Sequence, residues 1–262
     1  MPPDLPPVQN KILYIYRVLM KWFSFFFFGF SSLILIVFFL PPMKLFTHPT
    51  EKFKKRARQL VSDSFRFFIW LMHFLKIVDL EAENRETYKR LFSKIIVANH
   101  PSILDVVMLF SLIPNADCIV AEHLNHSIVK GIVRQLYILN SQDFESILKS
   151  CDESLKYGNC IVIFPEGTRT PRTGNPVVKK GAARIALSSG CGIIPLHIGG
   201  TDKYGLGKKD PWTAFNHRER YIYDIKMGKE ILPEKYMNLP KPVAARELTK
   251  DITSSIFAGK NT

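Results

Sequence analysis

One long apolar run near the N-terminus constrains this chain more than any other feature. Residues 22–40 read WFSFFFFGFSSLILIVFFL and carry no charged side chain over nineteen positions. At about 1.5 Å per residue, a helix of that length nearly matches the ~30 Å hydrocarbon core of a bilayer. The run has no polar face and exceeds the apolar core of a signal peptide, so it predicts an uncleaved membrane segment, with a buried core helix as the alternative.

Basic side chains flank this run on both sides. Three precede it, and a larger group follows it: Lys11, Arg17, Lys21, and then Lys44, Lys52, Lys54, Lys55, Arg56, Arg58. This bias favours a cytoplasmic location for the C-terminal side, and with it the rest of the chain. Basic residues on both flanks also fit a hairpin that enters and leaves the membrane by one face, broken at Pro41 and Pro42.

A second apolar pattern follows in residues 51–78. Its apolar side chains recur at helical spacing: Phe53, Ala57, Leu60, Val61, Phe68, Met72 and Leu75. The pattern predicts a basic amphipathic helix that lies either at the membrane interface or on the globular domain. Thirty-six Lys and Arg against 23 Asp and Glu give a net charge of +13, which indicates an anionic partner. Because the aromatic residues are not interleaved with the basic ones, lipid head groups are favoured over nucleic acid.

The cysteine and histidine patterns predict no metal site. Cys118, Cys151, Cys160 and Cys191 form no CxxC pair, so neither a zinc ribbon nor a disulfide framework is indicated, and a reducing compartment is expected. The histidines of 122-EHLNH-126 stand three residues apart, but no third ligand follows at a suitable spacing.

The hydrophobic pattern of the sequence changes at about residue 79. Short β-branched runs at residues 95–98, 118–120, 160–164, 193–198 and 221–225 alternate with helical patterns at 103–112, 127–136, 144–157, 180–189 and 243–257. This alternation predicts an α/β domain with a mixed, largely parallel sheet flanked by helices. We therefore expect membrane-anchoring helices in residues 1–78 and one α/β domain in residues 79–262.

Two strand ends carry candidate chemistry. In 95-IIVANHPSILD-105, Pro101 favours a turn that holds His100 before a helix, where Asp105 could accept the imidazole N–H and orient a general base. In 160-CIVIFPEGTRT-170, the turn after the strand offers backbone amides and a guanidinium to a phosphate group; its residues are Glu166, Gly167, Thr168 and Arg169. Alone, a histidine near a carboxylate is more often a surface or capping pair than a catalytic dyad, and Glu166 with Arg169 could form an ordinary ion pair.

Together, the two motifs resemble those of a known family. NHPSILD at 99–105 is similar to the NHxSxxD signature, and FPEGTR at 164–169 to the FPEGTR signature, of the 1-acylglycerol-3-phosphate acyltransferases. Lys180–Ala183 and Ile193–Pro195 resemble later blocks, so the similarity covers about residues 95–196. The resemblance implies that His100 and Asp105 form the catalytic pair, that residues 166–169 bind the acceptor's phosphate region, and that a membrane-bound enzyme acylates a lysophospholipid from acyl-CoA or acyl-ACP. It implies no other cofactor.

One segment departs from the family pattern. Where many members have an arginine near the acceptor, residues 137–140 read Tyr-Ile-Leu-Asn within 131-GIVRQLYILNSQD-143. The resemblance makes lysophosphatidate, which would give phosphatidic acid, the first expected acceptor. Because the arginine is missing, another lyso-lipid or a glycolipid is the alternative. A non-catalytic basic membrane adaptor is the hypothesis from a different class. Residues 199–207 are glycine-rich and predict a flexible, solvated loop that includes Lys203.

Overall fold

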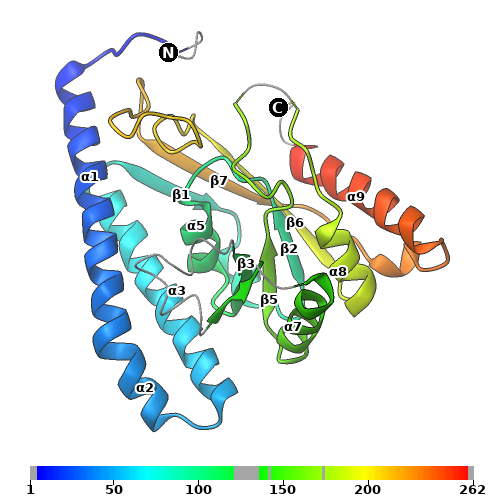
Figure 1. The fold of residues 1–262 in the computed structure, drawn as a ribbon. Helices are drawn as coiled ribbons and strands as arrows, with labels where there is room; N and C mark the ends of the chain where they lie inside the picture. Colours follow the sequence, from blue (N-terminus) through cyan, green and yellow to red (C-terminus); the bar gives the residue numbers. More distant parts are fainter. Residues whose placement is uncertain (1–4, 121–135, 141–142, 173–174, 259–262) are drawn as a thin grey trace.

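Seven strands form one sheet, and its connections place two strand ends side by side. The computed structural model describes residues 5–120, 136–140, 143–172 and 175–258. The strand order is β1-β7-β6-β2-β5-β3-β4 (Figure 1). The strands are β1 (Val78–Ala82), β2 (Ile95–Ala98), β3 (Ala116–Val120), β4 (Ile138–Leu139), β5 (Cys160–Ile163), β6 (Ile193–Gly200) and β7 (Tyr221–Met227). The β6 and β7 strands pair antiparallel, and the other paired strands run parallel.

Helices cover both faces of the sheet. Figure 1 shows α1 (Lys11–Ile34), α3 (Thr50–Phe74) and α5 (Asp105–Leu112) on one side, and α7 (Phe144–Lys156), α8 (Gly181–Ser189) and α9 (Lys241–Phe257) on the other. A short helix α4 (Arg85–Lys89) follows β1, and a 3₁₀ turn η3 (Pro233–Tyr236) precedes α9. Two hydrophobic clusters fill the spaces between these helices and the sheet. The predicted fold class, a largely parallel sheet between helices, is confirmed.

The central strands are buried because they are apolar along their whole length. All four residues of β2 are inaccessible to solvent, and β2 pairs in parallel with both β5 and β6. A strand between two parallel neighbours, covered on both faces, is expected to be a continuous apolar run. This position of β2 brings the ends of β2 and β5 to the same edge of the sheet.

The N-terminal apolar run forms part of a longer helical rod than expected. The rod comprises α1, the π-helical segment η1 (Leu35–Phe39) and α2 (Leu40–Phe46). The predicted break at Pro41 and Pro42 is wrong, because both prolines lie in the first turn of α2. Proline lacks a backbone N–H but is tolerated in a first helical turn, and the π-helical segment directly precedes this turn. The chain reverses after Phe46, and α3 begins at Thr50.

Helix α3 packs on the α/β domain, which was one of the two expected placements. Phe53, Ala57, Val61, Phe68 and Met72 are buried along one face, against α5 and β1 among other elements. The Arg58 guanidinium donates to the Asp117 carboxylate at 3.0 Å inside this contact. Three other aromatic side chains of α3 are more than half exposed: Phe67, Trp70 and Phe74. The helix thus has an inner apolar face and a separate outer aromatic face.

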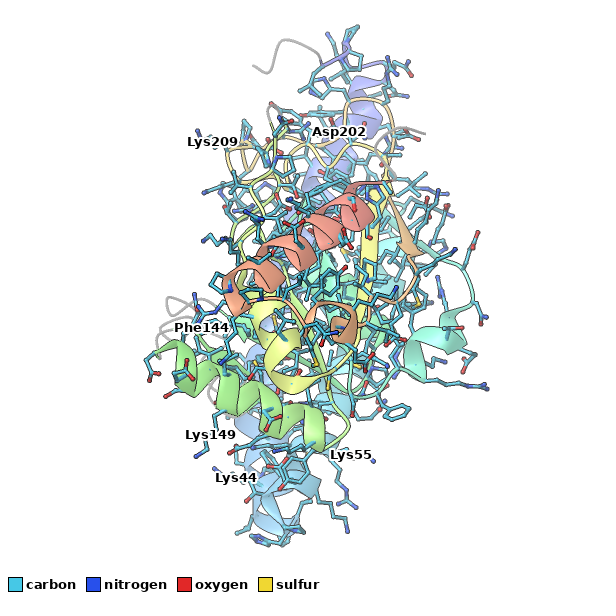
Figure 2. All side chains as sticks on the ribbon, turned by 90° about the vertical axis from the view of Figure 1, so that its right-hand side faces the viewer. Lys44, Lys55, Phe144, Lys149, Asp202 and Lys209 are labelled. Carbon is cyan, nitrogen blue, oxygen red and sulfur yellow. The ribbon has the colours of Figure 1, made fainter. Side chains whose placement is uncertain are left out.

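The rod from Lys11 to Phe46 is long and apolar enough to cross a membrane. That statement rests on length and composition within the described residues. Only 17% of its most apolar window is buried inside the protein, so most of its apolar surface faces outward. Figure 2 views the molecule from the side of α7, α8 and α9, with Asp202 and Lys209 towards one end and Lys44 and Lys55 towards the other.

Candidate active site

The first motif places a histidine and an aspartate in direct contact. His100 lies in the turn after β2, and Asp105 is the first residue of α5. His100 Nδ1 lies 2.7 Å from Asp105 Oδ2. The Asp105 side chain is fully buried, whereas the His100 side chain is 19% exposed. The carboxylate therefore orients the imidazole from inside the protein, and the ring reaches the surface.

Asp105 is held by further donors. Its carboxylate accepts from the Ser102 backbone N–H at 2.8 Å and from the Ser102 hydroxyl at 2.6 Å. Including His100, three hydrogen bonds reach one buried carboxylate, which is the arrangement that stabilises an ionised form without solvent. Asn99 fixes the same turn by exchanging two hydrogen bonds with the backbone of Ile198 in β6.

The second motif touches the first one directly. The His100 backbone N–H donates to Thr170 Oγ1 at 2.8 Å and lies 3.2 Å from Glu166 Oε1. The Thr170 backbone N–H donates in return to the His100 carbonyl oxygen at 2.7 Å. The ring of Phe164 stacks on the His100 imidazole at 4.2 Å between centroids. The turns after β2 and β5 are thus hydrogen-bonded to each other, at the edge of the sheet where these two parallel strands end.

In the predicted phosphate-binding turn, residues 166–169, some side chains are buried and others are exposed. Glu166 is buried against the His100 turn, whereas Gly167 and Thr168 are exposed. Gly167 has a φ of +67°, and a Cβ atom there would lie 2.7 Å from the Lys179 Nζ atom. Glycine is the residue that adopts this conformation at least cost, and it lets a lysine ammonium lie over the turn. Lys179 thus brings a cation to the turn formed by residues 166–169.

Arg169 is oriented by the loop that follows β6. Its Nη1 atom donates to the carbonyl oxygens of Leu206 and Gly207 at 3.0 and 2.9 Å. The guanidinium is therefore held in place by backbone, and the bidentate phosphate contact expected from the sequence stays a prediction. Arg172, which follows in the chain, is paired with Asp202 and Asp210.

The prediction for Lys203, which lies in the same loop, is wrong. Lys203 was expected in a solvated loop, but its side chain is only 6% exposed. Its ammonium donates to the carbonyl oxygens of Gly199, Thr201 and Ile222. Burial lowers the pKa of Lys203 to about 8, although nearby carboxylates, Asp105 first, oppose that shift. The carbonyl groups come from the end of β6, the residue after it and the start of β7, so only the folded chain assembles this site.

Tyr223 is a second buried residue that sequence reasoning missed. It lies in β7, its hydroxyl is 2.7 Å from the Ser102 hydroxyl, and it is fully buried. Burial, aided by the negative charge of Asp105, raises the pKa of Tyr223 well above its usual value. The alternating pattern of β7 indicates an inward side chain, but no local signal indicates contact with a motif 121 positions earlier.

Some sequence interpretations fall outside the described residues. They concern His123, His126, the helix predicted at residues 127–136 except its last residue, and residues 131–135 and 141–142 of the segment that departs from the family pattern. Of that segment, β4 pairs with β3 at the sheet edge, and Tyr137 packs against Phe110. Among the described residues, no group of three or more His, Cys, Asp or Glu side chains is placed to hold a metal ion.

One segment of the chain matches a family model. Residues 79–199 match the family model described as Acyltransferase, and they contain both motifs. The similarity to that family model therefore lies in the α/β part of the chain.

The chain is also similar to proteins that carry the name of the family that the motifs resemble. Over 113 residues the chain is 32% identical to the chloroplast 1-acyl-sn-glycerol-3-phosphate acyltransferase LPAT1 of Arabidopsis thaliana, covering 41% of this chain and 32% of that protein. It is 25% identical to a 1-acyl-sn-glycerol-3-phosphate acyltransferase of Pseudomonas aeruginosa, covering 59% of this chain and 62% of the relative. These two matches span 32% and 62% of the relatives' lengths, which is less than two thirds in each case. The resemblance predicted from the motifs is confirmed.

A solved structure shares the fold. The crystal structure of the 1-acyl-sn-glycerophosphate acyltransferase PlsC from Thermotoga maritima superposes with a TM-score of 0.65 at 21% identity. The similarity covers 92% of this chain and 97% of that one. At this identity the likeness is evidence for the fold.

Proposed function

We propose that this chain is a membrane-bound O-acyltransferase that acylates the hydroxyl of a lysophospholipid. The first candidate acceptor is 1-acyl-sn-glycerol-3-phosphate, which would give phosphatidic acid. The donor would be the thioester of acyl-CoA or acyl-ACP, acting as a co-substrate, and no resident cofactor is part of the proposal. The observation that carries the proposal is the His100–Asp105 contact of 2.7 Å, hydrogen-bonded through its turn to the second motif.

His100 would serve as the general base. Asp105 engages Nδ1, so Nε2 is the nitrogen that would take the proton from the acceptor hydroxyl. The hydroxyl oxygen attacks the thioester carbonyl carbon, an ester bond forms, and the carbon–sulfur bond breaks. The imidazolium then returns its proton to the thiolate. This sequence balances without a covalent enzyme intermediate, and holding both substrates side by side supplies much of the acceleration.

The second turn would bind the acceptor's anionic end. Gly167, Thr168 and Arg169 would contact the phosphate region, and the Lys179 ammonium lies next to Gly167. Glu166 is buried against the His100 backbone and would contribute by holding the turn in shape. An anion is attracted by backbone amides and fixed cations in such a turn. The acceptor's hydroxyl would then reach His100 from the adjacent strand end.

The apolar rod would bring the site to the lipid. The loop between β6 and β7 contacts α1 through Trp212, whose ring lies 6.2 Å from that of Trp22. The same loop holds Arg169. Basic residues beyond the apolar run favour the cytoplasmic side of a membrane for the catalytic domain. These contacts support acylation of an acceptor that stays in the membrane.

The proposal is tested by acyl transfer in reconstituted vesicles. Wild-type protein should transfer labelled acyl groups from acyl-CoA or acyl-ACP to a lysophospholipid, and His100→Gln should lower kcat by roughly 100-fold or more because the base is lost. His197→Gln is the matched control, since His197 Nδ1 contacts the Ile256 carbonyl oxygen on the α9 side. Equal rates in wild type and His100→Gln would refute the base assignment.

A panel of acceptors separates the remaining alternatives. Lysophosphatidate, other lysophospholipids and a glycolipid are offered with the same donor. Product from lysophosphatidate alone supports the first candidate, whereas a different preferred acceptor would replace it. No acyl product from any donor, with undiminished binding to anionic vesicles, would favour the membrane adaptor.

A further inference from the structure

A row of buried polar side chains continues inward from the catalytic pair. The Ser102 hydroxyl contacts Asp105 at 2.6 Å and the Tyr223 hydroxyl at 2.7 Å. The Lys203 Nζ atom lies 4.6 Å from the centroid of the Tyr223 ring. Asp105, Ser102 and Tyr223 are fully buried, and Lys203 is 6% exposed. Three parts of the chain that are distant in sequence thus meet behind His100.

The donors and acceptors in this row are determined by counting protons. The Ser102 hydroxyl has one proton, and its short contact with a carboxylate oxygen assigns that proton to Asp105. The Ser102 oxygen also accepts from the Leu104 backbone N–H at 3.1 Å. Tyr223 must then donate to Ser102, and its raised pKa keeps it protonated for that role. The bonds run in one direction, from Tyr223 through Ser102 to Asp105.

Lys203 places a positive charge behind this row. Its ammonium uses its three donors on the carbonyl oxygens of Gly199, Thr201 and Ile222, and its charge faces the Tyr223 ring. The acidic groups that act on it are Asp105, then Asp202, Asp224 and Glu219. With a pKa of about 8, the amine is predominantly protonated at neutral pH. It is a fixed cation on the buried side of the dyad.

A buried carboxylate beside an imidazole favours the protonated ring, which is useless as a base. A cation on the far side of that carboxylate opposes this effect and also stabilises the ionised carboxylate. We propose that Lys203 and Tyr223 are positioning residues for the dyad: they hold the Asp105 carboxylate in its orientation and weaken its attraction for a proton on the His100 ring. This inference rests on the proposed role of His100 as the base.

The test compares pH–rate profiles of kcat/KM. In Lys203→Met the acidic limb should move to higher pH by roughly half to one unit, with the largest loss of rate, about 3- to 10-fold, on that limb. Tyr223→Phe should move the limb in the same direction by less. Lys21→Met is the matched control, because the Lys21 ammonium is equally buried and donates to the carbonyl oxygens of Gly205 and Ala214 in the same loop. That control should leave the limb in place.

An unshifted limb in Lys203→Met, or an equal shift in Lys21→Met, would overturn the inference. Should Lys203→Met fail to fold, the isosteric Tyr223→Phe carries the test. If wild type proves inactive with every acceptor, the proposed function fails separately, and an NMR titration of the His100 ring, assigned with His100→Gln, still decides. Its midpoint must rise in Lys203→Met and stay unchanged in Lys21→Met.

Discussion

The buried lysine behind the dyad makes the stability of this protein depend on pH. Burial lowers the Lys203 pKa from 10.5 to about 8, so the folded protein releases this proton at a lower pH than the unfolded chain does. Between those two values the unfolded state binds more protons, and the free energy of unfolding therefore rises with pH. The protonated Lys203 thus lowers the free energy of unfolding at neutral pH.

We expect Lys203→Met to remove this rise. Denaturation in detergent solution at pH 7.5 and 9.5 should show that the wild-type free energy of unfolding gains on the variant as pH increases, by roughly 1 to 3 kcal/mol. Ionisation of exposed tyrosines near the upper pH affects both proteins alike and cancels in this difference. Parallel stability curves for the two proteins over this interval would contradict the burial of a charged amine.

The residues of the two motifs were predictable because each motif is local. His100 and Asp105 are five positions apart, and a turn followed by a helix start brings them into contact. Thr170 was not identified, although it follows the second motif directly, because its partner His100 lies 70 positions away. A contact of that separation depends on the register of β2 against β5.

The secondary structure elements were largely predictable because their patterns are strongly periodic. The strand at residues 95–98 and the helices α7 and α9 lie within two residues of the expected bounds. The edge strand β1 was missed, since the alternation in VDLEA is short and carries two charges. The outcome for α3 depended on packing, because an amphipathic stripe fits a membrane and a protein surface equally well.

The last residue of β6, Gly200, offers a test at the level of a single element. Gly200 has a φ of +90°, and a Cβ atom there would lie 2.0 Å from the Ile222 carbonyl oxygen. Gly200→Ala should therefore lower the free energy of unfolding by more than about 2 kcal/mol, because backbone must move and the site of Lys203 is disturbed. Thermal unfolding in detergent measures the loss.

Gly190 supplies the matched control for this substitution. It also has a positive φ, +70°, but a Cβ atom there would meet nothing within 4 Å. Gly190→Ala should cost only the conformational penalty of about 1 to 2 kcal/mol. If both variants lost the same stability, the close approach of the two strands at Gly200 would be wrong.

The whole molecule presents its apolar surface on one helical layer. Exposed aromatic side chains follow α1, including Phe26 and Phe30, which stack with nearly parallel rings. The outer aromatic face of α3 lies beside them, since the ring of Phe67 is 6.2 Å from that of Phe27. A continuous apolar surface of this kind on a protein with a net charge of +13 fits an anionic bilayer.

A double substitution tests this surface. Phe26→Asp with Phe30→Asp should abolish flotation with anionic vesicles, since burying each carboxylate in hydrocarbon costs about 2.5 to 3.5 kcal/mol. Tyr157→Asp is the control, because Tyr157 is 65% exposed at the end of α7 on the opposite layer. Undiminished flotation of the double variant would exclude α1 as the principal membrane contact.

The sequence by itself determined the apolar helix, the main strands and helices of the α/β domain apart from β1, α4 and β4, and the identity of the two motifs. Each depends on side chains within one turn or one element, where composition and spacing decide the conformation. The tertiary structure alone decided that the motifs share hydrogen bonds, that Arg169 is held by the backbone at Leu206 and Gly207, and that Lys203 is buried behind Asp105. These contacts join segments 37 to 98 residues apart, because packing and strand register, not local preference, bring such atoms together.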